Sequence, residues 1–186
     1  MAVLTPDFGD FSRIDCGDEI DLGQRRYRIT GFERERRFGI EDPKFWVKRA
    51  VDVETGERKL LKFAFFESFY TSLAGVKIRC FRSPEKESRI LELVDGNPFF
   101  MQGSSFWDEK GNNIRVLDIV RGTNFFVKLG NLVMDHRTYF ETRLPAILEA
   151  LIESFEAIRK LHINGLCHGV ILNYHLIVKQ ETEKYV

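Results

Sequence analysis

Two charged residues, Lys62 and Glu87, are the first candidates for chemistry. Lys62 lies in an apolar run with strand character, and Glu87 lies in a predicted helix that follows it. A lysine on a strand can simply point into water, and a glutamate early in a helix can simply complement the helix dipole. Neither residue therefore means much alone. Glu87 is the natural counterion for Lys62, since a lysine is rarely buried unpaired.

Histidines near the end of the chain could bind a metal or act as a base, but their spacing supports neither role. His162, His168 and His175 fit no known helical or knuckle pair of metal ligands, and no carboxylate accompanies them. Cys167 directly precedes His168, and sequence neighbours do not face each other as a nucleophile and its base must. The three cysteines are odd in number and far apart, so they form no disulfide framework. We expect no metal site, and free thiols in a reducing compartment.

The composition is that of a folded protein with no excess of charge. The 186 residues include 17 Phe and are 44% hydrophobic, which excludes a disordered tail, and at about 150 residues per domain they make one domain or two small lobes. Basic and acidic residues number 28 each, which argues against a nucleic-acid binder. No apolar run reaches the roughly 18 residues of a membrane span, and the N-terminus does not resemble a signal peptide. We expect a cytoplasmic protein with no nucleic-acid or membrane partner.

Five strands are predicted around the two candidate residues. Tyr27 and Ile29 alternate with polar residues, which is typical of a half-buried strand. Runs of β-branched and aromatic residues flank a Gly-containing turn at 54–57 and a second one at 108–113, and each pair of runs predicts a hairpin. The predicted strands span residues 24–32, 45–53, 58–65, 99–107 and 114–120.

A short helix is predicted over residues 83–94, between the third and fourth strands. Ser83 can cap this helix, Pro84 suits its first turn, and Glu87 is one of the acidic residues that complement the positive end of its dipole. The predicted order is therefore three strands, a helix and two strands, with Lys62 on the third strand and Glu87 on the helix.

A long helix is predicted over residues 138–163. Pro145 fits only the first turn of such a helix, and Gly165 offers a left-handed exit. The apolar residues recur at i, i+3, i+4 and i+7 spacing and are Leu144, Ile147, Leu148, Leu151, Ile152, Phe155, Ile158 and Leu161. This stripe is wide enough to expect burial. Left exposed over residues 144–161, it would mark a surface for a protein partner or a second copy of the chain.

In their order and spacing, five segments resemble the protein-kinase family over nearly the whole chain. They look like the second and third strands of the small lobe at 47–62, the αC helix at 87–91, the fifth strand and hinge at 114–126, the end of a large-lobe helix at 161–168, and the catalytic loop at 168–178. The resemblance implies an α+β fold, in which a small lobe with an antiparallel five-stranded sheet and one αC-type helix precedes a truncated, mainly helical large-lobe portion. It divides the chain into an N-terminal extension (1–23), a small lobe (24–122) and a partial large lobe (123–186).

The resemblance also implies a nucleotide-binding site. Lys62, held by Glu87, would present its charge to the α- and β-phosphates of ATP. Leu117 would be the gatekeeper, the backbone of residues 118–120 would read the adenine edge, and apolar residues would cover the ring on both sides. The residues implied in nucleotide binding are Gly31, Val47, Leu60, Lys62, Glu87, Leu117, Asp118, Val120 and Ile177.

Several positions depart from the kinase pattern, and together they predict impaired catalysis. Val170 stands where the loop carries the Asp that accepts the substrate proton, and His175 stands where it carries the Asn that holds a metal ion. Leu60 would crowd the adenine, and the residues between Gly31 and Val47 do not form a glycine-rich loop. No Asp-Phe-Gly segment follows the catalytic loop. We expect weak ATP binding at best, no Mg²⁺, and a fragment or shortened form of the domain.

Three function hypotheses stay open. The first is a kinase-like nucleotide-binding domain, a Ser/Thr-type phosphotransferase by resemblance, with impaired catalysis. The second is a pseudokinase-type module that binds or scaffolds another protein. The third is part of a small-molecule phosphotransferase, because His168-Gly169 resembles the His-Gly-Asp loop of aminoglycoside- and choline-kinase-like enzymes. The remaining alternative is a plain α+β domain in which Lys62 and Glu87 are only surface charges.

Overall fold

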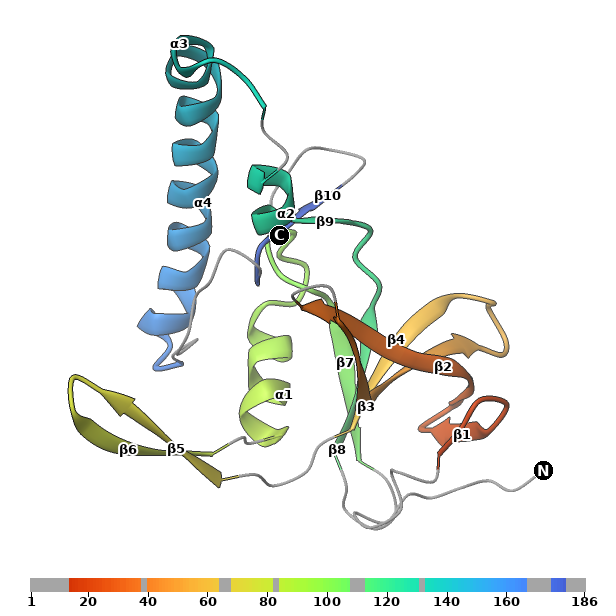
Figure 1. Cartoon of the computed structure of the whole chain (residues 1–186). Helices are drawn as coiled ribbons and strands as arrows, with labels where there is room; N and C mark the ends of the chain where they lie inside the picture. Colours follow the sequence, from red (N-terminus) through yellow and green to blue (C-terminus); the bar gives the residue numbers. More distant parts are fainter. Residues whose placement is uncertain are drawn as a thin grey trace. The chain divides into compact units, whose positions relative to one another are not determined.

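The computed structural model of the chain describes residues 14–37, 40–63, 68–81, 84–107, 113–130, 133–166 and 175–179 (Figure 1). The chain divides into two compact units. The first is made of Met1–Asp95 and Gln102–Ile119, and the second of Gly96–Met101 and Val120–Val186. None of the helices described has both the length and the hydrophobicity needed to span a membrane.

The first unit contains an antiparallel sheet with the strand order β1-β2-β3-β4-β8-β7 (Figure 1). The strands are β1 (Glu19–Leu22), β2 (Arg25–Arg37), β3 (Ile40–Asp52), β4 (Arg58–Phe63), β7 (Gly103–Trp107) and β8 (Asn113–Asp118). The five predicted strands are all present. The prediction of a five-stranded sheet is nevertheless wrong, because β1 adds a sixth strand. Ile20 and Leu22 alternate into the core and are almost fully buried, which secures β1 on the sheet.

The two-residue period of the strands decides which side chains reach the core. In β4, Leu61 and Phe63 are fully buried, whereas Leu60 and Lys62 lie on the opposite face and are half-buried. The core consists of Ile14, Ile20, Leu22, Tyr27, Ile29, Ala50, Leu61, Phe63, Ile114 and Val116, with Phe106 packed against it. Lys62 is therefore carried by a strand whose alternate side chains are anchored in the core.

A buried lysine attaches the segment before β1 to the sheet. Lys48 on β3 has no exposed surface, and its Nζ donates to the carbonyl oxygen of Ile14 at 2.9 Å. The same ammonium lies 3.9 Å from the centre of the Phe32 ring, which favours a cation at that place. Burial lowers the pKa of Lys48, since the core opposes its charged form.

The helix α1 (Pro84–Leu93) confirms the predicted short helix, and it contacts β7 and β8 (Figure 1). Glu85 and Glu87 lie in its first turn, where the helix dipole favours negative charge. Ser83, the predicted cap, lies outside the described residues. Ser88 is buried against the sheet, where its hydroxyl oxygen accepts from the side-chain amide of Asn113 at 2.9 Å.

A separate hairpin, β5 (Ser68–Leu73) and β6 (Val76–Phe81), lies between β4 and α1 in the chain and was not predicted. The two strands are joined by Ala74 and Gly75, whose φ angles of 49° and 82° are both positive. Such a two-residue loop matches the right-handed twist of a hairpin. The signal for it in the sequence is an Ala-Gly pair between two short runs of strand-forming residues.

The second unit is mainly helical. It contains β9 (Gly122–Asn124), α2 (Phe125–Gly130), α3 (His136–Thr138), a π-helical turn η2 (Tyr139–Arg143), α4 (Leu144–Ile163) and β10 (Ile177–Lys179), which pairs with β9. The predicted helix over 138–163 is present, but it is continuous α-helix only from Leu144. Pro145 lies in the first turn of α4, and Gly165 with φ 72° follows its end, as predicted.

Gly103 provides a test of how tightly β7 and β8 pack. A Cβ atom at this position would lie 2.4 Å from the carbonyl oxygen of Val116, closer than any tolerated contact. We expect Gly103→Ala to lower the free energy of unfolding by about 1–3 kcal/mol, because the backbone must shift. Gly130→Ala is the matched control, since nothing lies within 4 Å of its added Cβ. Urea unfolding followed by circular dichroism measures both variants, and equal stabilities would contradict the close approach.

Candidate functional site

The ion pair predicted from the sequence is present in the structure. Lys62 Nζ on β4 donates to Glu87 Oε2 on α1 at 2.7 Å, across 25 residues of sequence. The two side chains are about one third exposed, at 32% for Lys62 and 35% for Glu87. The pair is therefore partly shielded from water, yet open enough for an anion to reach the ammonium.

Arg115 is a third member of this cluster, and the sequence reasoning missed it. Arg115 lies on β8 directly opposite Lys62, and its side chain is only 3% exposed. Its Nη1 donates to the same carboxylate oxygen of Glu87 that Lys62 contacts, and its Nη2 lies 3.5 Å from the carbonyl oxygen of Lys62. Two cations on neighbouring strands therefore share one carboxylate from the helix.

The charges of Lys62 and Arg115 keep Glu87 ionised. Burial alone would raise the pKa of Glu87, but the charges of Lys62 and Arg115 outweigh burial and hold this pKa below its ordinary value. Burial lowers the pKa of Arg115, and the carboxylate of Glu87 opposes that effect. An arginine stays charged under all ordinary conditions, so at neutral pH the cluster consists of two cations and one anion.

The ionised state of Glu87 predicts a loss of stability in acid. Its pKa in the folded protein lies below the ordinary value of 4.5, so its contribution to stability is complete above pH 4.5 and is lost as the pH falls toward the folded pKa. We expect wild type to be more stable than Glu87→Gln at pH 7 and the two to converge as the pH falls through the folded pKa of Glu87. Urea unfolding at constant ionic strength measures this, and a difference that does not change with pH would contradict it.

Three further predicted residues lie on the same face of the sheet as Lys62. Val47 on β3 is opposite Lys62, and Leu117 on β8 is opposite Leu60 on β4. Residues directly opposite each other in a ladder share a face, as do residues two apart on one strand. Val47, Leu60 and Leu117 therefore form an apolar surface beside the ion pair.

Gly31 lies in an irregular part of β2. The ladder between β2 and β3 changes register on both sides of the segment 31–32, and Gly31 has a φ of 150°, which other residues rarely adopt. Gly31 is paired with Arg49, which lies two residues beyond Val47 on β3. Gly31 therefore belongs to the same sheet as Lys62.

Both the backbone and the side chain of Asp118 make hydrogen bonds within the fold. Its backbone N–H donates to the carbonyl of Gln102 at 2.9 Å, and its carboxylate accepts from Lys59 Nζ at 2.8 Å. The backbone N–H of Asp118 is therefore already bonded to Gln102, the residue before β7. Val120 and Ile177 belong to the second unit, where Ile177 pairs with Asn124.

The sequence departs from the pattern of a kinase catalytic loop at Val170 and His175. Val170 lies outside the described residues. His175 is exposed in the second unit. Within the described part of the chain, no three His, Cys, Asp or Glu side chains gather as they would around a metal ion.

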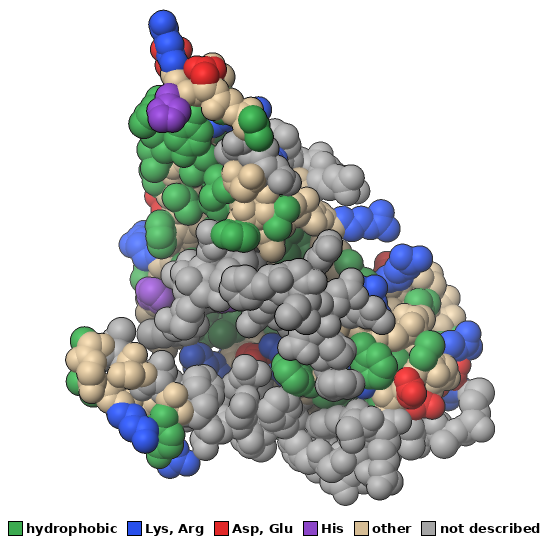
Figure 2. All heavy atoms as spheres, viewed as in Figure 1, with side chains coloured by type: hydrophobic (Ala, Val, Ile, Leu, Met, Phe, Trp, Pro, Cys, Tyr) green, Lys and Arg blue, Asp and Glu red, His purple; other side chains and the backbone are tan. Residues whose placement is uncertain are grey.

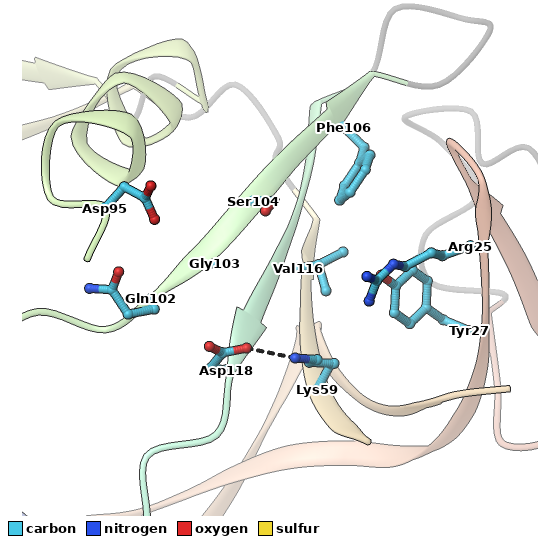
Figure 3. A pocket seen from close by; sticks show the side chains of 10 residues that line it. All are labelled: Arg25, Tyr27, Lys59, Asp95, Gln102, Gly103, Ser104, Phe106, Val116 and Asp118. Carbon is cyan, nitrogen blue, oxygen red and sulfur yellow. Dashed lines mark hydrogen bonds and ion pairs between the residues drawn. The ribbon is translucent and has the colours of Figure 1, made fainter. Parts of the chain in front are cut away.

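A separate pocket of about 350 Å³ lies on the core face of the sheet (Figure 3). It is lined by Arg25, Tyr27, Lys59, Asp95, Gln102, Gly103, Ser104, Phe106, Val116 and Asp118. Its two cations are paired, Lys59 with Asp118 at 2.8 Å and Arg25 with Asp52 at 3.2 Å. Lys59 and Lys62 are three residues apart on one strand and so face opposite ways. The pocket is therefore distinct from the Lys62 cluster.

Comparison with known proteins shows that the fold of this chain is similar to that of a solved structure. No protein-family model and no curated protein matches the chain. Among solved structures, the chain is similar to the apo form of PpkA-294, a serine/threonine kinase, with a TM-score of 0.54 and 19% sequence identity. The match covers 93% of this chain and 59% of that one, so this chain spans less than two thirds of its length. The similarity supports a kinase-like fold.

Proposed function

We propose that the chain is a protein-kinase-like domain that binds the phosphates of ATP at Lys62 and transfers no phosphoryl group. The observation that carries the proposal is the 2.7 Å ion pair between Lys62 on β4 and Glu87 on α1, the first helix described after that strand. A carboxylate that fixes a lysine in one position preorganises its charge for a phosphate. The apolar surface of Val47, Leu60 and Leu117 on the same face supports a planar base beside the phosphates.

The lack of phosphoryl transfer follows from two residue types in the sequence. Val170 cannot accept a proton, and His175 is a poor substitute for the amide that holds Mg²⁺ in a kinase loop. Without a base and a second metal ligand, bound ATP would lack both an activated nucleophile and charge neutralisation at its γ-phosphate. Weak binding without turnover is the expected behaviour.

Titration calorimetry and a turnover assay test this proposal together. ATP is titrated into the full chain with and without Mg²⁺, and the same protein is incubated with Mg-ATP and generic protein substrates. We expect weak binding and neither ADP release nor phosphorylated protein by mass spectrometry. Robust turnover would contradict the proposed inactivity, and no heat or thermal shift at millimolar ATP would contradict nucleotide binding. ADP release that requires an added aminoglycoside or choline would instead favour a small-molecule phosphotransferase.

A second candidate function is protein binding through α4. Leu148, Ile152 and Phe155 are 48%, 58% and 56% exposed, although their spacing puts them on one side of the helix. Figure 2 shows hydrophobic side chains gathered on the surface along α4. Exposed apolar stripes of this kind favour a partner protein or a second copy of the chain. Sedimentation of wild type and Ile152→Glu tests self-association, which the substitution should abolish; a monomer at all concentrations would argue against a homodimer.

A further inference from the structure

We propose that Arg115 is a positioning residue of the Lys62 site, which holds Glu87 and α1 against the sheet independently of Lys62. The inference rests on the proposed function and deepens it. Arg115 keeps the Glu87 carboxylate in place, and this carboxylate in turn holds the ammonium of Lys62 where an anionic ligand can reach it. Arg115 acts on the ligand only through Glu87.

The different burial of the two cations supports this division of roles. Arg115 is 3% exposed and Lys62 is 32% exposed, and both donate to the same oxygen of Glu87. A buried guanidinium contributes more to holding a carboxylate than a partly hydrated ammonium does, because water competes less for it. The more exposed partner is the one that a ligand can reach.

A second contact holds the next residue of the helix to the same strand. Asn113, two residues before Arg115 on β8, donates to the buried hydroxyl of Ser88 at 2.9 Å. Residues two apart on a strand share a face, so Asn113 and Arg115 both point at α1. Adjacent helix residues are thereby fixed by two side chains of one strand. We call these two contacts, Arg115–Glu87 and Asn113–Ser88, the β8 latch.

The polar contacts of the β8 latch are a poor way to gain stability alone. Within the described part of the chain, Arg115 Nε and Asn113 Oδ1 are buried and make no hydrogen bond. Buried polar atoms without partners oppose folding, and apolar side chains of similar volume often replace a buried ion pair at no loss of stability. The polar latch therefore secures the position of Glu87, which apolar packing would leave unspecified.

Hydrogen exchange of the α1 amides in the full chain tests the latch. We expect Arg115→Met to speed exchange of these amides by about tenfold or more, while Lys62→Met leaves it within about threefold of wild type. Amides of the β3–β4 ladder serve as the internal reference for global unfolding. Arg28→Met is the control for the loss of a paired arginine far from α1. Arg28 is 56% exposed and pairs with Glu19, and these two residues lie on β2 and β1, at the end of the sheet opposite to β8 and β7. Equal loosening of α1 by Lys62→Met and Arg115→Met would overturn the proposal.

ATP affinity distinguishes a positioning role of Arg115 from a purely structural one, because a purely structural role would leave the affinity of the folded protein unchanged. We expect Arg115→Met to weaken ATP binding about tenfold at a temperature where its reference amides are protected, and Arg115→Lys to recover part of this loss. Unchanged ATP affinity in Arg115→Met would overturn the positioning role. If wild type binds no ATP, the proposed function fails, and the exchange comparison still decides whether the latch exists.

A variant without a charge change covers the case in which Arg115→Met does not fold. Ser88→Ala removes the hydroxyl that Asn113 contacts and leaves the three charges in place. We expect its α1 amides to exchange about threefold faster or more, with the reference amides unchanged. Exchange at the wild-type rate would overturn the second half of the latch.

Discussion

Lys62→Met is expected to weaken ATP binding by about tenfold to a hundredfold and to leave the protein folded. A hydrogen bond between charged groups contributes about 1.5–3 kcal/mol, and each 1.4 kcal/mol corresponds to a factor of ten in affinity. Methionine keeps the aliphatic length of the side chain and removes only the ammonium. Because Lys62 is 32% exposed, its loss should have little effect on the free energy of unfolding. Titration calorimetry with ATP measures the affinity.

Lys59→Met is the control that separates a local effect from a loss of positive charge. Lys59 lies on the same strand but on the opposite face, where it pairs with Asp118 and Glu57 at 2.8 Å each. We expect its removal to change ATP affinity by less than about twofold. If both lysine variants lose affinity equally, the effect is one of net charge, and Lys62 has no special role.

Phe63→Ala is expected to have the largest effect on stability, with a loss of about 3–5 kcal/mol in the free energy of unfolding. Phe63 is 1% exposed and belongs to the core of the sheet. Truncation to alanine removes most of a buried ring and leaves a cavity that the neighbouring strands cannot close fully. A domain of marginal stability would be largely unfolded by such a change. Urea unfolding at several temperatures measures the loss.

Phe126→Ala is the matched control for the loss of a phenyl ring. Phe126 is 58% exposed on α2, so its truncation should cost less than about 1 kcal/mol. Similar losses in both variants would mean that the burial of Phe63 does not determine its contribution. Residues 62 and 63 are neighbours on β4, and these experiments assign ligand binding to one and stability to the other.

The parts of the fold that follow from short-range patterns could be predicted from the sequence. Alternation of apolar residues predicted β2, and runs of β-branched and aromatic residues around Gly-containing turns predicted β3, β4, β7 and β8. Cap and charge signals predicted α1. The pairing of Lys62 with Glu87 followed from the order of those elements. The hairpin β5–β6 was missed because its short strands are exposed: Tyr70 and Val76 are 59% and 63% exposed, so no core pattern marks them.

Arg115 could not be found from its local sequence. It lies among apolar residues of β8, and a charged residue in such a strand can equally be a solvated side chain. Its role depends on a helix that precedes it by 28 residues and on the register that sets it opposite Lys62. Register is decided by the whole sheet, so a single-sequence pattern carries little information about it. Strand β1 was missed for a different reason: it is only four residues long, which is too short for a clear pattern of alternation.

The β5–β6 hairpin also determines how the candidate site could be taken apart. Its loop at Ala74 and Gly75 is exposed, so a protease can cut the chain between the strand that carries Lys62 and the helix that carries Glu87. Strands β1–β4 would then belong to one polypeptide, and α1, β7 and β8 to another. The ladder between β4 and β8 would be the backbone seam that joins them. Nucleotide binding by the nicked protein would report complementation of the two pieces.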